Sequence, residues 1–317
     1  MIKTTLTGIA CILILLACSE KPEPEAPKPK TAAPIPAAAI TEFSGEKALE
    51  HIKKITAFGP RPAQSKAYQK TLIYLEEYLH GLGWKTRRNT FQALTPLGRV
   101  TFTNLLARYL PDGEPDWSTS PSFLVSGHLD TKKYNDKTFL GANDSGSSTG
   151  VMLELARVLS EHDDAALQVE LVFFDGEEAM NKNIVFRKDG LYGSTNYAKN
   201  LLKRKTRPSL GIVLDLVGDH RVPLLIGGDS HSSAVAHSRT AVKTLGLEKA
   251  ISFPKTSILD DHIPLMTFAN LPVLHLIGEF SSMDYWHTDR DTLDQLSPTA
   301  LENSGKLTLQ VLHQMTN

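Results

Sequence analysis

The stretch that decides the fold reads Val169-Glu170-Leu171-Val172-Phe173-Phe174-Asp175-Gly176-Glu177-Glu178. Its β-branched and aromatic residues predict a buried strand that ends at Asp-Gly, and open α/β sheets place their chemistry at such strand ends. Two adjacent carboxylates repel each other, and burial raises the cost of charging both. A metal ion would relieve this conflict, because one carboxylate could bind the ion while the other transfers protons. A solvated acidic turn would explain the pair of glutamates equally well.

Length and composition define the broad class of the chain. The 317 residues are 41% hydrophobic and 22% charged, which is typical of a soluble globular protein with one large domain or two small ones. The formal net charge of −1 provides no basic surface for nucleic acid, so we expect no nucleic-acid partner. The only cysteines are Cys11 and Cys18, so we expect no disulfide and no cysteine ligand in the globular part.

Residues 1–17 resemble a bacterial lipoprotein signal peptide. Lys3 precedes an apolar stretch from Ile9 to Ala17 that is too short to span a bilayer as a mature helix. Processing of such a signal would leave Cys18 as the lipidated first residue, and each acyl CH₂ buried in the membrane contributes about 0.8 kcal/mol to anchoring. An ordinary secretory signal cleaved near Cys18 and an uncleaved anchor are the alternatives. From the signal we expect an exported protein of the bacterial cell envelope that is lipid-anchored at Cys18. Ser19 rather than aspartate follows the cysteine, which in enteric-type bacteria favours the outer membrane, facing the periplasm.

The segment between the signal and the globular part is rich in proline, alanine, lysine and glutamate. Because such a composition cannot bury a core, we expect residues 18–42 to form a disordered tether. We expect residues 43–317 to form a single domain and the protein to be a monomer. Apolar periodicity predicts strands at 91–94, 100–109, 122–126, 167–174, 210–216, 222–226 and 273–277. It predicts helices at 46–56, 68–79, 148–160, 192–203, 232–245 and 298–315. This alternation of strands and helices indicates an α/β domain with a central sheet.

Side chains that can bind a metal recur where predicted strands end or helices begin. Aspartate, glutamate and histidine without cysteine suit catalytic zinc, which keeps an open position for substrate. Each residue also has a structural alternative: Asp144 could cap the following helix, and His262 could be a packed, hydrogen-bonded histidine. For Asp215 the functional interpretation is favoured, because strands rarely bury acids without partners. The complete set is His128, Asp130, Asp144, Glu177, Glu178, Asp215, Asp260, Asp261, His262 and His287.

The order of these residues along the chain is more specific than any one of them. The segments that carry it are GHLDTK at 127–132, GANDSGSSTGVMLELAR at 141–157, FFDGEEA at 173–179, LYGS at 191–194, DDHIPL at 260–265, LPVLHLI at 271–277 and YWHTDRDTLD at 285–294. Together they resemble the zinc-dependent M28 peptidase family, which includes aminopeptidases and glutaminyl cyclases. The resemblance extends from around Phe43 to the C-terminus. It implies a three-layer α/β sandwich with a central mixed, mostly parallel β-sheet flanked by helices.

Two branches of this family fit the sequence, and a shared fold cannot decide between their reactions. The aminopeptidase branch binds two zinc ions and would use Glu177 to activate a water. Its metal ligands would be His128, Asp144, Glu178, Asp215 and His287. The cyclase branch binds one zinc, and the resemblance then implies Glu177 as the general acid and base. Its metal ligands would be Asp144, Glu178 and His287.

Several features favour the cyclase branch, among them that Asp260 extends the shared Asp-His pair and that Trp286 directly precedes His287. The resemblance thus implies a glutaminyl-peptide cyclotransferase, an acyltransferase that converts N-terminal glutamine of peptides or proteins to pyroglutamate and releases ammonia. Its single catalytic domain would hold one zinc ion per chain, or two if the protein is an aminopeptidase. The segment 180–190 departs from the cyclase pattern, because animal cyclases place a pocket tryptophan there, and this leaves the substrate preference open.

The same resemblance assigns roles to further residues. Asp215 and Asp260 would be catalytic and form a carboxylate network that holds the substrate amine and the tetrahedral intermediate, and acids buried so close together would share a proton. An apolar pocket for the glutamine side chain would be lined by Ile258, Phe280 and Trp286. A catalytically inactive binding lipoprotein with the same fold is a third hypothesis, against which the complete set of acids argues.

Overall fold

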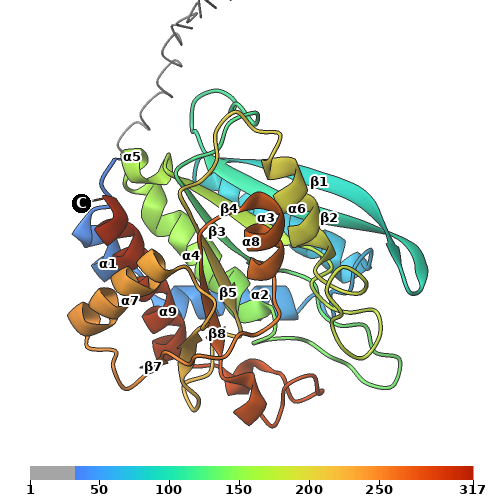
Figure 1. Cartoon of the computed structure of the whole chain (residues 1–317). Helices are drawn as coiled ribbons and strands as arrows, with labels where there is room; N and C mark the ends of the chain where they lie inside the picture. Colours follow the sequence, from blue (N-terminus) through green and yellow to red (C-terminus); the bar gives the residue numbers. More distant parts are fainter. Residues whose placement is uncertain (1–32, 317) are drawn as a thin grey trace, which may run out of the picture. The chain divides into compact units, whose positions relative to one another are not determined.

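The predicted strands pair into one mixed sheet (Figure 1). The structure, a computed structural model, describes residues 33–316, and within them the eight-stranded sheet has the order β1-β2-β4-β3-β5-β8-β6-β7. The strands are β1 Trp84–Thr95, β2 Gly98–Tyr109, β3 Phe123–His128, β4 Val169–Phe174, β5 Leu210–Asp215, β6 Leu224–Ile226, β7 Ile251–Ser252 and β8 Val273–Gly278. The central strands β4, β3, β5 and β8 are parallel, whereas β2 pairs with β4, and β6 with β8, in the antiparallel direction.

Helices cover both faces of this sheet and complete three layers (Figure 1). Helices α6 and α8 pack on one face against Leu124, Val172 and Val213, and the remaining helices pack on the other face against residues such as Val125 and Leu171. The helices are α1 Ala37–Glu42, α2 Gly45–Thr56, α3 Lys66–Gly81, α4 Gly146–Ser160, α5 Asp163–Ala166, α6 Tyr192–Leu201, α7 Ser232–Leu245, α8 His262–Ala269 and α9 Pro298–Thr316. The expected three-layer α/β sandwich with a mixed sheet is therefore confirmed.

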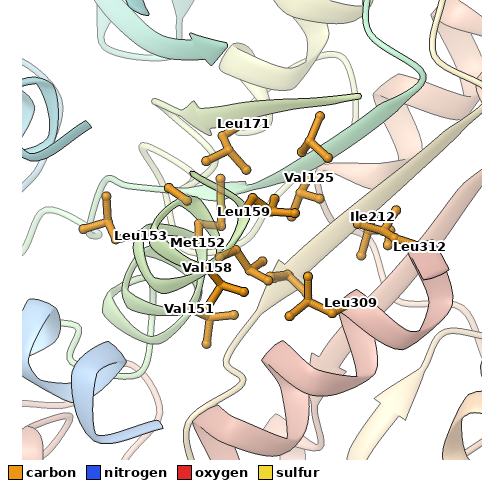
Figure 2. Packing of buried hydrophobic residues seen from close by; sticks show 14 of the residues in the cluster. Val125, Val151, Met152, Leu153, Val158, Leu159, Leu171, Ile212, Leu309 and Leu312 are labelled. Atoms are coloured by element: carbon orange, nitrogen blue, oxygen red, sulfur yellow. The ribbon is translucent and has the colours of Figure 1, made fainter. Parts of the chain in front are cut away.

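Helix α4 packs on the sheet beside α9 at the centre of the larger core (Figure 2). A Cβ atom at Gly150 would lie 2.6 Å from the Ala48 carbonyl oxygen, so glycine allows α2 to approach this closely. Each fully buried aliphatic side chain in this core stabilises the fold by roughly 1.5–3 kcal/mol. They include Val125, Val151, Met152, Val158, Leu159, Leu171, Ile212, Leu309 and Leu312 (Figure 2). The packing fixes the start of α4 and thereby the position of Asp144, which lies just before it.

The N-terminal boundary of the domain differs from the expectation. Residues 37–42 form α1, and Ile35 and Ala39 are fully buried in the core that also contains α9. The Ile35 backbone N–H donates to Thr316 Oγ1 at 3.0 Å. The expected boundary at residue 43 is thus too late, because a few well-placed apolar side chains dock a segment whose average composition resembles a linker.

Residues 1–32 lie outside the described residues, and with them the expected signal peptide, Cys18 and most of the expected tether. Among the helices that the structure describes, none has the length and apolar character needed to cross a membrane.

The first hairpin is longer than its sequence pattern indicated. Strand β1 begins at Trp84 rather than at residue 91, and it pairs with β2 from Trp84 opposite Tyr109 to Thr95 opposite Gly98. The added part reads Lys85-Thr86-Arg87-Arg88-Asn89-Thr90, which lacks apolar alternation. An edge strand that pairs on one side only can carry such polar residues, so apolar periodicity missed it.

Candidate active site and metal centre

The candidate site lies at the carboxyl ends of the parallel strands, where open α/β sheets bind their ligands. His128 ends β3, Asp215 ends β5, Glu177 follows β4 and His287 follows β8. These loops surround a cavity of about 320 Å³, within the range of about 300–1,000 Å³ that is usual for small-molecule sites. All nine residues predicted to be catalytic, metal-binding or substrate-binding line it: Asp144, Glu177, Glu178, Asp215, Ile258, Asp260, Phe280, Trp286 and His287. The structure thus brings these residues together, and their individual roles stay predictions.

The three expected metal ligands have the spacing that zinc requires. His287 Nε2 lies 3.3 Å from Asp144 Oδ2 and 3.2 Å from Glu178 Oε1. Ligand atoms at about 2.0–2.1 Å from a tetrahedral ion are about 3.3–3.4 Å apart, so the three residues fit one zinc ion. The carboxylates also favour a cation between them: burial alone would lower the pKa of His287, but its bonds to both acids raise this pKa to about 10.

A second set of possible ligands shares Asp144 with the first. His128 Nε2 lies 3.2 Å from Asp144 Oδ1 and 3.2 Å from Asp215 Oδ1. These distances are again close to the separation between two ligand atoms of a tetrahedral zinc ion. Burial raises the pKa of Asp215 to about 7, although its hydrogen bond with His128 opposes the shift. The side-chain geometry therefore accommodates one ion or two, as the residue types did.

The two adjacent glutamates have different partners. Asp130 accepts hydrogen bonds from the backbone N–H groups of Glu177 and Glu178, at 3.2 and 3.3 Å, and so fixes the loop after β4. The Glu178 carboxylate accepts from the backbone N–H of Lys132 at 3.1 Å and from its Nζ at 3.4 Å. Within residues 33–316, no hydrogen bond reaches the Glu177 carboxylate, whose Oε2 lies 4.0 Å from His128 Nδ1. Glu177 is therefore the acid that is available to a substrate.

The electrostatic surroundings of Glu177 suit proton transfer. Burial raises its pKa well above the usual value, and repulsion from Glu178, Asp260 and Asp261 adds to the shift, while His128 opposes it. A carboxyl group with a raised pKa can both accept and return a proton near neutral pH. The role of Glu177 as general acid and base stays a prediction.

Asp260 is supported by a pair of stacked histidines. Its Oδ2 accepts a hydrogen bond from His275 Nε2 at 2.7 Å. Burial alone would raise the pKa of Asp260, but this bond and the charge of the nearby imidazoles lower it to about 2. His262 stacks on His275 with ring centroids 3.9 Å apart, and its Nε2 donates to Asp229 Oδ2 at 2.9 Å. Because the rings are only 16° from parallel, their nitrogen lone pairs cannot converge on one ion, so His262 is a packed, hydrogen-bonded histidine.

The two aspartates expected in the carboxylate network each have a histidine partner. Asp215 is bonded to His128 and Asp260 to His275. These imidazole partners reduce the repulsion between the acids. A proton shared among the acids stays a prediction.

Trp286 belongs to the wall of the cavity rather than to the core. With 37% of its surface exposed, it is not a buried packing residue. Its ring stacks on His287, with centroids 4.1 Å apart, and lies 4.8 Å from the ring of Phe280. Ile258 and Ile277 also line the cavity. An apolar wall beside carboxylates suits a ligand with a short carbon chain and polar ends.

Three residues hold the site in place through contacts that the sequence did not predict: Arg61, Asp130 and Asp291. The buried Arg61 guanidinium donates to the carbonyl oxygens of Leu129, Leu140 and Gly141, at 3.2, 2.8 and 2.9 Å. The Asp291 carboxylate accepts from the backbone N–H groups of Asn143 and Asp144, at 2.7 and 3.1 Å, as Asp130 does in the glutamate loop. Asp130 and Asp291 lie in the motif segments, but contacts to backbone amides leave no residue pattern by which to recognise them. Arg61 lies in Phe58-Gly59-Pro60-Arg61-Pro62, where nothing in the local sequence indicates contacts with the loops of the site.

The chain resembles known proteins over most of its length. Peptidase family M28 matches residues 104–312 of the chain. A glutaminyl-peptide cyclotransferase of Dictyostelium discoideum is 27% identical over 308 residues, with 84% of each chain covered. A solved glutaminyl cyclase of an Acidobacteriales bacterium has a TM-score of 0.75 and 26% identity, covering 92% of this chain and 98% of that one. A leucine aminopeptidase precursor from Bacteroides thetaiotaomicron has a TM-score of 0.76 and 22% identity, covering 86% of this chain and 97% of that one, which shows a common fold only.

The fold and the site define a class of α/β enzyme whose aspartate, glutamate and histidine side chains at the strand ends could hold a metal ion. The chain belongs to peptidase family M28. Its relatives include glutaminyl-peptide cyclotransferases, so the resemblance recognised in the sequence, both to the family and to its cyclase branch, is confirmed.

Proposed function

We propose that the protein is a glutaminyl-peptide cyclotransferase, an acyltransferase that converts N-terminal glutamine of peptides or proteins to pyroglutamate and releases ammonia. The observation that carries the proposal is the Glu177 carboxylate, which lines the cavity beside the ligand set and accepts no hydrogen bond from the described residues. A carboxylate in this position can accept a proton from the α-amine of a substrate. The relationship to the cyclotransferase of D. discoideum supports the same assignment.

Cyclisation requires the α-amine of the terminal glutamine to attack the carbon of its own side-chain amide. Because the attack is intramolecular, the site must hold a folded-back side chain rather than bring two molecules together. Asp144, Glu178 and His287 would hold one zinc ion, which would supply Lewis-acid polarisation of the amide carbonyl. Glu177 takes a proton from the attacking amine and returns it to the amide nitrogen, so that one C–N bond forms, the other breaks and ammonia leaves.

Other residues of the cavity bind and orient the glutamine. Asp260, which stays ionised because its pKa is lowered, attracts the substrate α-ammonium group, which loses one proton to solvent before its nitrogen attacks as the neutral amine. Asp215 adds to the acidic surroundings of the amine. Trp286 and Ile258 offer apolar contacts to the two methylene groups of the glutamine side chain.

A product assay tests the proposal. Purified protein is incubated with a peptide that begins with glutamine, and ammonia, pyroglutamyl peptide and free glutamine are measured. Ammonia together with pyroglutamyl peptide supports the cyclotransferase. Free glutamine would instead support the second candidate, a dinuclear aminopeptidase, which the 3.2 Å spacings of His128 to Asp144 and Asp215 favour. Metal analysis of the active enzyme gives an independent result, because one zinc ion per chain is expected for the cyclotransferase and two for the aminopeptidase.

We also propose that the enzyme acts as a monomer on peptide or protein N-termini outside the cytoplasm, held to the membrane by lipid at Cys18. The signal-like sequence at residues 1–17 and the proline-rich segment that follows support this location. Cell fractionation and the intact mass of the mature protein test it. The wild type is expected in the membrane fraction with an acylated N-terminus, and Cys18→Ala is expected to leave that fraction. A mature N-terminus at another residue would contradict the proposal.

A further inference from the structure

The segment 180–190 is a loop whose two ends are tied together. The Asp189 side chain is buried, and its carboxylate accepts hydrogen bonds from the backbone N–H groups of Met180 at 2.7 Å and Asn181 at 2.9 Å. Tyr192 donates its hydroxyl to the same carboxylate at 3.1 Å. Val185 and Asp189 also exchange backbone hydrogen bonds of 2.8 Å. The loop therefore has a defined conformation, although its sequence is polar.

This loop packs directly against the loop after β4 that carries Glu177 and Glu178. Gly190 has a φ of +89°, and a Cβ added there would lie 2.7 Å from the Glu177 carbonyl oxygen and 3.1 Å from Ile184 Cγ1. The backbone of Glu177 and the side chain of Ile184 thus approach each other across Gly190. Consequently Lys182, Asn183 and Ile184 line the same cavity as the catalytic and ligand residues.

Among the described residues, Lys182 is the unpaired cation of this cavity. Two lysines line the cavity among the described residues. Lys132 is buried and engaged, because its Nζ donates to the Ala179 carbonyl oxygen at 2.8 Å and to Glu178 Oε2 at 3.4 Å. Lys182 is exposed, and within the described part of the chain its ammonium group has neither a hydrogen bond nor an ion pair. A positive charge thus stands at the rim of a cavity whose interior is acidic.

The acidic interior and the positively charged rim of the cavity determine how a peptide substrate would be oriented. The acids of the interior attract the terminal ammonium group, so the glutamine binds inside the cavity. The second residue of the peptide then lies at the rim. We propose that Lys182 selects substrates in which an acidic residue, aspartate or glutamate, follows the terminal glutamine. This inference rests on the proposed cyclotransferase function and assigns the segment 180–190 a role in specificity.

The expected effect is modest because Lys182 is solvent-exposed. Exposed ion pairs correspond to a preference of about two- to fivefold, which salt weakens. The measurement is kcat/KM of the full-length enzyme for three peptides that differ only at the second residue, which is glutamate, glutamine or lysine. We expect the order glutamate, glutamine, lysine at low ionic strength and a smaller spread in about 0.5 M salt.

Variants assign the preference to one side chain. Lys182→Gln is expected to abolish the ratio between the glutamate and glutamine peptides, and Lys182→Glu is expected to reverse the order in favour of the lysine peptide. The matched control is Lys188→Gln, which removes an equal charge from the same loop outside the cavity lining and is expected to leave the ratio unchanged. Because each enzyme is compared with itself, a general loss of activity does not affect the ratio.

The outcomes separate this inference from the proposed function. If no glutamine peptide yields pyroglutamate, the proposed function itself is overturned. If the wild type cyclises all three peptides equally, or if Lys182→Gln keeps the preference for glutamate, then the selective role of Lys182 is overturned while the cyclotransferase function stands. A preference that is lost equally in Lys188→Gln would show a general effect of charge and would also overturn the assignment to Lys182.

Discussion

Replacing Glu177 by glutamine should separate catalysis from metal binding. The substitution preserves the size of the side chain and removes its ability to accept and return a proton. The loop should keep its position, because Asp130 bonds to the backbone N–H groups of Glu177 and Glu178 rather than to their carboxylates. The 3.2 and 3.3 Å spacings of His287 to Glu178 and Asp144 do not involve Glu177, so the zinc content should also be unchanged.

The size of the loss follows from the chemistry assigned to Glu177. General acid and base catalysis contributes about 10²–10⁴-fold, which corresponds to about 3–5 kcal/mol in the activation free energy. We therefore expect kcat for a glutamine peptide to fall by that factor. The free energy of unfolding should not fall, because burial and the neighbouring acids already disfavour the charged form of Glu177. A neutral amide removes that unfavourable interaction.

Three measurements on the same preparations test this reasoning: ammonia release, zinc per chain and urea unfolding. Glu178→Gln is the matched control, since it makes the same chemical change one residue away in a metal ligand, and it should lower the zinc content together with the activity. The reasoning is refuted if Glu177→Gln retains wild-type kcat. It is also refuted if Glu177→Gln loses zinc while Glu178→Gln keeps it, because the two roles would then be exchanged.

Three further predictions concern other parts of the molecule. Ile35→Ala should lower the free energy of unfolding by about 2–5 kcal/mol in urea, because Ile35 is fully buried, whereas the exposed Thr41→Ala should change it by less than about 0.5 kcal/mol; equal effects would contradict the docking of α1. Burial lowers the pKa of His51 from 6.5 to about 4, so the folded protein disfavours the proton that the unfolded chain binds as pH falls below 6.5. The wild type should therefore lose about 2 kcal/mol of stability between pH 7 and 5 that His51→Gln retains, as unfolding at both pH values would show, and parallel pH profiles would contradict this. Trp286→Ala should raise KM for a glutamine peptide about tenfold at unchanged zinc content, and an unaltered KM would remove Trp286 from the substrate wall.

The elements that place the site could be predicted because their signals are local. An apolar run such as Val169–Phe174 identifies a buried strand by itself, and polar residues directly after it can only lie at the strand end. The carboxyl ends of adjacent parallel strands meet at one edge of the sheet, so His128, Glu177 and Asp215 could be expected to converge.

The parts that could not be predicted depend on contacts between distant segments. Helix α1 is stable because Ile35 and Ala39 fit against a core that includes α9, and nothing within residues 33–42 shows that such a surface exists. Arg61 likewise donates hydrogen bonds to the backbone carbonyls of Leu129 and Leu140. The sequence around Arg61 gives no indication of these contacts. The pairing of Asp260 with His275 joins two segments that the resemblance had identified separately.

The choice between cyclisation and hydrolysis depends on which carbonyl of the substrate reaches the ligand set. Well-oriented intramolecular nucleophiles have effective molarities of about 10⁵–10⁸ M, far above the concentration of liquid water. A terminal glutamine whose side-chain amide lies at Asp144, Glu178 and His287 would therefore cyclise before water could attack it, whether the site holds one ion or two. Hydrolysis would require the first peptide carbonyl to occupy that place and the side chain to point elsewhere. The apolar wall formed by Ile258 and Trp286 beside the ligands is suited to the two methylene groups of a folded-back side chain, and this favours cyclisation independently of the number of ions.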